Sequence, residues 1–248
     1  WKKMFDQGKL NEIQSAFWRT KPPIEFYDTL EDPHEVNNLA NSQSHAAVRD
    51  RLAAELHRWQ MEIRDLGFLP EGEMHERRGK LTPYDLGKDN SKYPLASIKK
   101  AADFATTANK SSLAQLRKMM SDKDPAIRYW AATGCIIVGE ESKILKSDLI
   151  RLLEDSCPDV RTASAHALFV LGDAKIAVPV LEKILSEKNQ FYRLRAMNVI
   201  DHMDENAREA VQRIAKVGDS AKVGAYGENY IGNVIKKAAS DLNIKAVK

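Results

Sequence analysis

The chain has 248 residues, enough for one large or two modest domains, and its 43% hydrophobic and 29% charged residues are typical of a globular protein. Its 38 basic and 35 acidic residues nearly balance at a formal net charge of +3, so charge gives no reason to expect a nucleic-acid partner. No apolar run approaches the roughly 20 residues that a membrane-spanning helix needs. Because the chain starts in mid-pattern with Trp1 rather than Met, we expect it to be part of a longer protein.

The first predicted element is a short β-strand around residues 24–28. Ile24 and Phe26 alternate there with polar neighbours, which is typical of a half-buried strand. Asp32-Pro33 then predicts a turn, and Asn37-Asn38 leads into the next element.

A long amphipathic helix is predicted for residues 42–66. Its apolar residues recur at steps of three and four and form one stripe: Val48, Leu52, Leu56, Trp59, Ile63 and Leu66. Charged residues fill the other face, as on a solvated surface. Gly67 is expected to end the helix in a left-handed backbone conformation.

Together these features resemble the C-terminal end of a type I sulfatase. In that family a closing strand of the form E-L/F-Y-D-L is followed by D-P-x-E-x-N-N-L-A and a final helix. This chain has Glu25-Phe26-Tyr27-Asp28-Thr29-Leu30 and then Asp32-Pro33-His34-Glu35-Val36-Asn37-Asn38-Leu39-Ala40. The resemblance covers roughly the first 95 residues and implies that residues 1–69 are the end of a sulfatase-like C-terminal subdomain.

The resemblance also implies what would lie upstream. A sulfatase of this type hydrolyses sulfate esters with a formylglycine nucleophile and Ca²⁺, both held by a large N-terminal domain. That missing domain is therefore an expected partner of this chain. The location of the protein stays open here, and it would be periplasmic or secreted if the parent is an exported bacterial sulfatase.

The segment 70–94 is charged and rich in proline and glycine, so a loop-like linker is predicted there. A short helix at about 95–108 would open a separate domain that covers residues 95–248.

That last domain repeats itself. Asp124-Pro125-Ala126-Ile127-Arg128 is echoed by Cys157-Pro158-Asp159-Val160-Arg161, and Arg193 marks a weaker third copy; the arginines lie 33 and 32 residues apart. Leucine-rich second helices follow, Leu171-Gly172-Asp173 predicts a tight turn, and a helix at about 228–242, including Tyr230 and preceded by Tyr226, would close the stack. The pattern resembles short HEAT repeats and predicts an α-solenoid of stacked helix pairs, making the chain mainly α.

The recurring arginines, Arg128, Arg161 and Arg193, have two interpretations. Each would reach a loop carboxylate of the neighbouring repeat and form a partly buried ion pair, which is the favoured interpretation. Alternatively, the three would line up as a strip that binds an anion such as a sulfated glycan. Bidentate pairing suits arginine in both cases, so residue type does not decide.

The remaining titratable residues suggest no catalytic or metal site. Cys135 and Cys157 have no cysteine or histidine partner at ligand spacing, and we expect two free, buried thiols, although one disulfide stays possible in an exported protein. His75 lies in a charged cluster that we interpret as a solvated loop rather than an acid–base pair, and His166 is expected to be half-buried.

Catalytic signatures are absent from the sequence. It contains no G-x-S-x-G, Walker loop, G-x-G-x-x-G or H-E-x-x-H motif, and the sulfatase signature C/S-x-P-S-R does not occur either. No catalytic, cofactor-binding or metal-binding residue is therefore predicted in this segment.

Two functional hypotheses remain. The first is the non-catalytic C-terminal part of a sulfatase-like hydrolase, whose repeats shape substrate access or bind a sulfated glycan or a protein. The alternative is an independent HEAT-repeat scaffold that binds proteins, although such a scaffold has no need of the segment 1–40. A stand-alone repeat enzyme is the weakest hypothesis.

Overall fold

The computed structural model describes residues 1–217 and 229–244, and over this range the chain is mainly helical and contains no β-strand. It divides into two compact units, Trp1–Ile63 and Arg64–Lys248. The division of the chain into domains at residues 69 and 95 stays a prediction.

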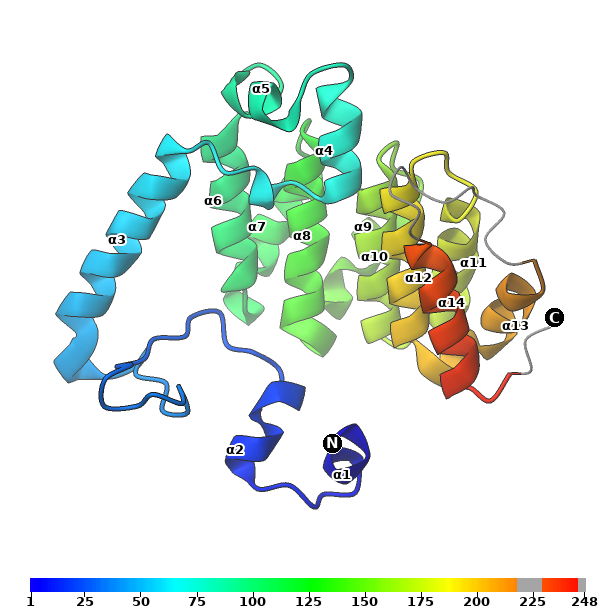
Figure 1. Cartoon of the computed structure of the whole chain (residues 1–248). Helices are drawn as coiled ribbons and strands as arrows, with labels where there is room; N and C mark the ends of the chain where they lie inside the picture. Colours follow the sequence, from blue (N-terminus) through cyan, green and yellow to red (C-terminus); the bar gives the residue numbers. More distant parts are fainter. Residues whose placement is uncertain (218–228, 245–248) are drawn as a thin grey trace. The chain divides into compact units, whose positions relative to one another are not determined.

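The first unit contains three helices, labelled in Figure 1: α1 (Lys2–Asp6), α2 (Glu12–Ser15) and the long α3 (Ala46–Glu62). Short 3₁₀ turns follow α2 at Ala16–Trp18 and precede α3 at Gln43–His45. Four aromatic rings gather around α1 and α2, with centroids 4.9 to 6.1 Å apart: Trp1, Phe5, Phe17 and Trp18.

The predicted strand at 24–28 is wrong, because an asparagine takes the place of a neighbouring strand. The side chain of Asn38 accepts a hydrogen bond from the Phe26 N–H at 3.0 Å and donates one to the Ile24 carbonyl at 3.1 Å. The Leu39 N–H donates to the Phe26 carbonyl at 2.7 Å. The extended segment therefore satisfies its backbone locally, inside a loop.

The long helix is confirmed, but its end is not where the sequence placed it. Helix α3 stops at Glu62, and Arg64 (φ 58°) rather than Gly67 takes the left-handed conformation. Gly67 lies in a 3₁₀ turn over Leu66–Phe68, where its N–H donates to Asp65 Oδ1 at 2.8 Å.

The second unit consists of short helices in sequence. They are α4 (Glu71–Arg78), α5 (Pro83–Lys88), α6 (Leu95–Thr106), α7 (Leu113–Met119), α8 (Pro125–Val138), α9 (Lys146–Leu152), α10 (Pro158–Val170), α11 (Ala174–Ile184), α12 (Gln190–His202), α13 (Arg208–Val217) and α14 (Tyr230–Asp241). Short 3₁₀ turns precede α7, α9 and α13 at Lys110–Ser112, Gly139–Leu145 and Asp204–Ala207. The closing helix is thus present from Tyr230 on, whereas Tyr226 and Glu228 lie outside the described residues.

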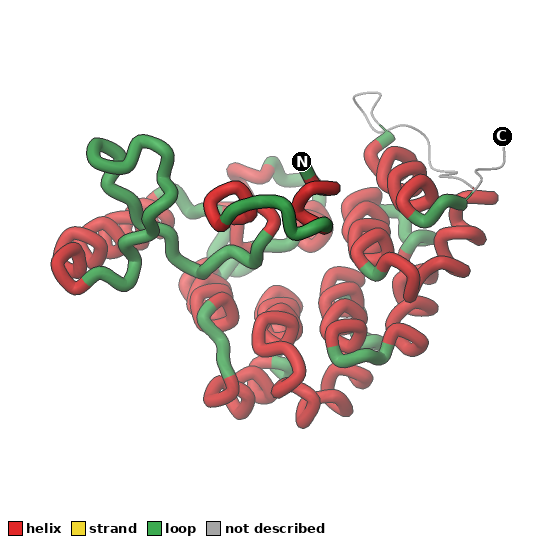
Figure 2. Tube along the Cα trace, turned by 90° about the horizontal axis from the view of Figure 1, so that it is seen from below, coloured by secondary structure: helices red, strands yellow, loops and turns green. Residues whose placement is uncertain are grey.

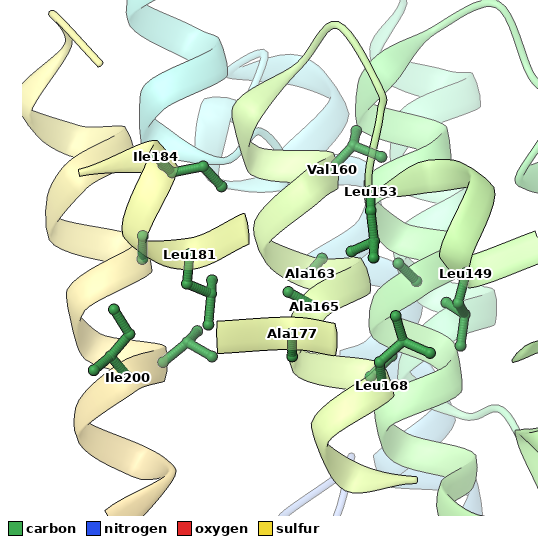
Figure 3. Packing of buried hydrophobic residues seen from close by; sticks show 14 of the residues in the cluster. Leu149, Leu153, Val160, Ala163, Ala165, Leu168, Ala177, Leu181, Ile184 and Ile200 are labelled. Atoms are coloured by element: carbon green, nitrogen blue, oxygen red, sulfur yellow. The ribbon is translucent and has the colours of Figure 1, made fainter. Parts of the chain in front are cut away.

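These helices pack as pairs in two rows, seen almost end-on in Figure 2. Helices α6, α8, α10, α12 and α14 contact one another in succession, and α7, α9, α11 and α13 cover them from one side. One continuous apolar core runs between the rows, and Figure 3 shows its middle, where Ala163 and Ala165 allow close approach of α10 to its neighbours.

Local sequence explains where the repeat helices begin and end. A proline occupies the first turn of α8 and of α10, where its missing N–H costs nothing. Asp124 caps α8 by accepting a hydrogen bond from the Ala126 N–H at 2.9 Å. Gly172, at φ 85°, makes the predicted tight turn between α10 and α11.

The segment 70–94, expected to be a loop-like linker, holds the two helices α4 and α5 instead. Tyr93 is fully buried, and its carbonyl oxygen accepts a hydrogen bond from Arg64 Nη2 at 3.0 Å. Helix α4 contacts α10 and α12 directly. The prolines and glycines here start and stop short helices rather than leaving the chain free.

Replacing Asn38 by alanine should loosen the loop that replaces the strand. The Phe26 and Ala40 N–H groups both lose their acceptor, and a lost hydrogen bond of about 1 kcal/mol corresponds to roughly fivefold faster amide exchange. Hydrogen exchange measured by mass spectrometry checks this. The neighbouring Asn37→Ala is the control and should leave exchange at Phe26 unchanged; equal rates in both variants would contradict the assignment.

Candidate binding site at the ends of the repeat helices

The three predicted arginines make the same backbone contacts in successive repeats. In each, one terminal nitrogen, Nη1, donates to the carbonyl oxygens six and five residues earlier. The distances are 2.8 and 3.1 Å for Arg128, 2.8 and 3.4 Å for Arg161, and 2.8 and 3.0 Å for Arg193. Each arginine therefore holds the loop that leads into its own helix.

Two of the arginines also reach a carboxylate of the next repeat. Arg128 forms a two-pronged ion pair with Asp155 at 2.7 and 2.8 Å, and Arg161 pairs with Glu187 at 2.5 Å. The hydrogen bonds that Arg128 donates to the Asp155 carboxylate raise the pKa of Arg128 above its ordinary value. Arg193 makes no ion pair within the described residues, and its Nε is buried without an acceptor. Use of the series as an anion-binding strip stays a prediction.

A second group of charged residues connects α4 to the repeats, and we call it the α4 cluster: Glu73, Arg77, Asp124, Cys157 and Asp159. Arg77 donates to Glu73 Oε1 at 2.7 Å and to Asp124 Oδ2 at 3.1 Å, so one guanidinium lies between two carboxylates. The three side chains are only 9 to 12% exposed. Burial works against the charged form, yet the bonds to Asp124 and Glu73 leave the pKa of Arg77 raised.

Helix α4 contacts the N-cap residue of three successive repeat helices. Arg77 binds Asp124 of α8, Glu73 Oε2 accepts from Cys157 Sγ of α10 at 3.3 Å, and Asn189 of α12 donates to the Gly72 carbonyl at 3.2 Å. Only glycine fits at position 72, because a Cβ there would collide with the ring of Tyr192. The segment therefore lies along a row of helix N-termini.

Asp159 is the most deeply buried carboxylate of the α4 cluster, at 1% exposed. Its Oδ2 accepts from the Glu73 N–H at 2.9 Å, whereas Oδ1 has no hydrogen-bond donor and lies 3.8 Å from Arg195 Nε. Loss of hydration outweighs the attraction of Arg195 and raises the pKa of Asp159 to about 6. Burial also raises the pKa of the Cys157 thiol, which therefore stays protonated.

Two open cavities flank Glu73 and share it, together with Pro125, as lining. The larger, which we call the α4 cavity, has a volume of about 670 Å³ and is lined by Glu73, Arg77, Asn90, Ser91, Lys92, Pro94, Ser97, Asp122, Lys123, Asp124, Pro125 and Ile127. The smaller, of about 330 Å³, is acidic and is lined by Glu73, Glu76, Pro125, Ser156, Cys157, Pro158, Glu187 and Tyr192. The volume of the α4 cavity lies within the usual range for sites that bind small ligands.

The histidines do not build a catalytic pair in the described part of the chain. His75, interpreted from the sequence as part of a solvated loop, lies on α4 and stacks on Phe191 with ring centroids 4.1 Å apart. His166 is half-buried, and its ring lies 5.4 Å from that of His202. Burial and the charges of His202 and Arg195 lower the pKa of His166 to about 4, so it is neutral at pH 7.

The α4 cluster was not predicted from the sequence. Glu73 and Arg77 lie in the charged segment around His75 that the sequence predicts to be a solvated loop, yet Glu73 is buried and the Arg77 side chain is only 12% exposed. The one local signal is Gly72. Its lack of a side chain is explained only by the fold, in which Tyr192 and Asp159 lie against it. Cys135 and Cys157 are both buried and free.

Within residues 1–217 and 229–244, no group of three or more histidine, cysteine or acidic side chains could hold a metal ion. None of the helices in this range combines the length and apolar character needed to span a membrane.

Comparison with known proteins gives one informative similarity. An ulvan-active sulfatase from Formosa agariphila is 42% identical to this chain over 69 residues. Part of this chain is related in sequence to a sulfatase. The matched region is 27% of the chain and 12% of that sulfatase, so it spans only a small fraction of the relative's length. No family model matches the chain.

Replacing Arg128 by alanine should destabilise the second unit more than Arg161→Ala does. Asp155, at 7% exposed, would be left buried without its cation, which costs about 3 kcal/mol, whereas Glu187, at 37% exposed, can be hydrated and the loss is about 1 kcal/mol. Urea denaturation measures both. The exposed Arg151→Ala is the control and should stay within about 0.5 kcal/mol of the original protein. Equal midpoints for Arg128→Ala and the original protein would refute a stabilising ion pair.

Asp159→Asn should stabilise the protein at pH 7 by about 1–3 kcal/mol. The raised pKa of Asp159 means that the folded chain binds more protons than the unfolded chain between about pH 4 and pH 6, so the penalty of ionisation grows as pH rises and is complete above pH 6. Asparagine avoids that penalty and can still accept from the Glu73 N–H. Thermal unfolding should show the gain at pH 7 and its loss near pH 4.

The matched control is Asp155→Asn, which removes an ion-paired carboxylate and should destabilise the protein at pH 7. A gain for Asp159→Asn that did not change with pH would show that desolvation of Asp159 is not its cause.

Proposed function

We propose that this chain is the non-catalytic C-terminal part of a sulfatase-like hydrolase that acts on a sulfated glycan. The partial identity to an ulvan-active sulfatase carries the proposal. In the parent protein, sulfate-ester hydrolysis would use a formylglycine and Ca²⁺ held by residues upstream of this chain. In this proposal the residues of this chain take no part in the chemical step.

The first unit supports the proposal through its uncovered apolar surface. The stripe on α3, formed by Val48, Leu52, Leu56, Trp59 and Ile63, is 44 to 52% exposed at every position. A long helix with an apolar stripe normally buries it, and a contiguous exposed patch marks an interaction site. We propose that the stripe packs against the upstream catalytic domain.

The second unit would then be a rigid module. We interpret its paired helices as a HEAT-like solenoid, a fold whose repeats share one core. The α4 cluster adds contacts across three repeats and so limits bending at this end. Such a module can shape access of an extended substrate or bind a partner.

A scaffold without sulfatase chemistry is the second candidate, and one observation favours it. The second unit has its own continuous core, from Ala101 to Leu242, and needs no residue of the first unit to form it. A repeat domain of this kind can serve in unrelated proteins.

The deciding experiment expresses the protein together with its upstream region and measures hydrolysis of a sulfated glycan. Sulfate release that disappears when the upstream nucleophile is replaced supports the sulfatase-like parent. An upstream region without a C/S-x-P-S-R motif and without activity would favour the scaffold.

Leu56→Asp in that longer protein should lower its melting temperature by several degrees and reduce activity, because a charge would be buried against the catalytic domain. The expected cost is about 3 kcal/mol. Arg51→Asp, a charge change on α3 outside the stripe, is the control and should leave both properties nearly unchanged. If Leu56→Asp behaves like Arg51→Asp, the stripe does not pack against that domain.

A further inference from the structure

We propose that the α4 cavity binds one anionic sugar residue of a glycan, with Lys92 and Lys123 holding its sulfate or carboxylate group. The choice of a sugar rests on the proposed function, whereas the requirement for an anion comes from the geometry. Nine of the twelve lining residues are polar or charged, so the α4 cavity suits a polyhydroxylated ligand rather than an apolar one.

The acidic groups of the α4 cavity already have partners. Arg77 binds both Glu73 and Asp124, the thiol of Cys157 donates to Glu73, and Asp122 Oδ1 accepts from the Asp124 N–H at 2.8 Å. A cationic ligand at Glu73 or Asp124 would therefore have to break contacts that hold α4 in place.

The two lysines that line the α4 cavity, in contrast, have no bonding partner for their side chains in the described part of the chain. Neither Lys92 nor Lys123 forms an ion pair or a side-chain hydrogen bond within the described residues, and each ammonium group has three donors. The side chains of Asn90 and Ser97 likewise make no hydrogen bond in that range and can bind hydroxyl groups of a sugar. The two lysines offer donors only, so a ligand group held by both must supply acceptors.

The neighbouring acidic cavity orients the ligand. Glu76 and Glu187 line it on the other side of Glu73, and their charges repel a sulfate or carboxylate. The anionic group should therefore stay at Lys92 and Lys123. The carbon faces of the sugar can lie against Pro94, Pro125 and Ile127.

Isothermal titration of the full chain with short dextran sulfate, unmodified dextran, oligogalacturonate and oligoglutamate tests the proposal. Dextran sulfate or oligogalacturonate should bind, and their comparison tells whether a sulfate or a uronate is preferred; unmodified dextran should bind at least tenfold more weakly. Lys92→Ala and Lys123→Ala should each weaken binding about fivefold, and the pair about 25-fold. Ser97→Trp, which fills the cavity and keeps both lysines, should abolish binding.

Lys175→Ala is the matched control, an exposed lysine on α11 that lines neither cavity. Melting temperatures equal to that of the original protein confirm that the variants fold. The proposal is overturned if no anionic glycan binds, if Lys175→Ala weakens binding as much as Lys92→Ala, or if oligoglutamate binds as tightly as the glycans. Because this measurement involves no hydrolysis, its failure leaves the activity test of the longer protein unaffected, and a longer protein without activity would leave a positive titration standing.

Discussion

The position of α4 depends on burying carboxylates at the N-terminal ends of α8 and α10. A helix N-terminus favours negative charge, but a buried carboxylate is costly unless it is paired. Arg77 resolves this conflict for Glu73 and Asp124 together, since one guanidinium binds both. At Asp159 the conflict is resolved only in part, because one carboxylate oxygen has no hydrogen-bond donor. The pKa of Asp159 therefore rises to about 6. The cavities beside α4 exist because this arrangement holds the segment 70–94 against the repeats.

The helical character of the second unit could be predicted from the sequence because its determinants are local. The interval of 33 and 32 residues between arginines, the proline that starts α8 and α10, and Gly172 in the turn all act within one helix pair. The α4 cluster has no such local signature. Glu73 and Asp159 are 86 residues apart, and the sequence around Glu73 has the charge density of a solvated loop. Glu73 and Arg77 are shielded from solvent only because the fold brings the distant N-cap residues of α8 and α10 beside them.

The predicted strand failed for a related reason. Alternation of apolar and polar residues shows that a segment can lie in a sheet, but a strand also needs a partner for its backbone groups. Here the side chain of Asn38 accepts from the Phe26 N–H and donates to the Ile24 carbonyl, and the Leu39 N–H donates to the Phe26 carbonyl. The residues that carry the resemblance to the end of a sulfatase therefore form a loop in this chain, and the side chain of Asn38 bonds its backbone.

The two units differ in whether they bury their apolar residues. In the second unit the leucines and isoleucines between the helix rows are buried, so its fold follows from its own sequence. In the first unit none of the α3 residues is buried, although the helix itself is long enough to be well formed. An amphipathic pattern without a covered face is what the contact proposed for the α3 stripe would require.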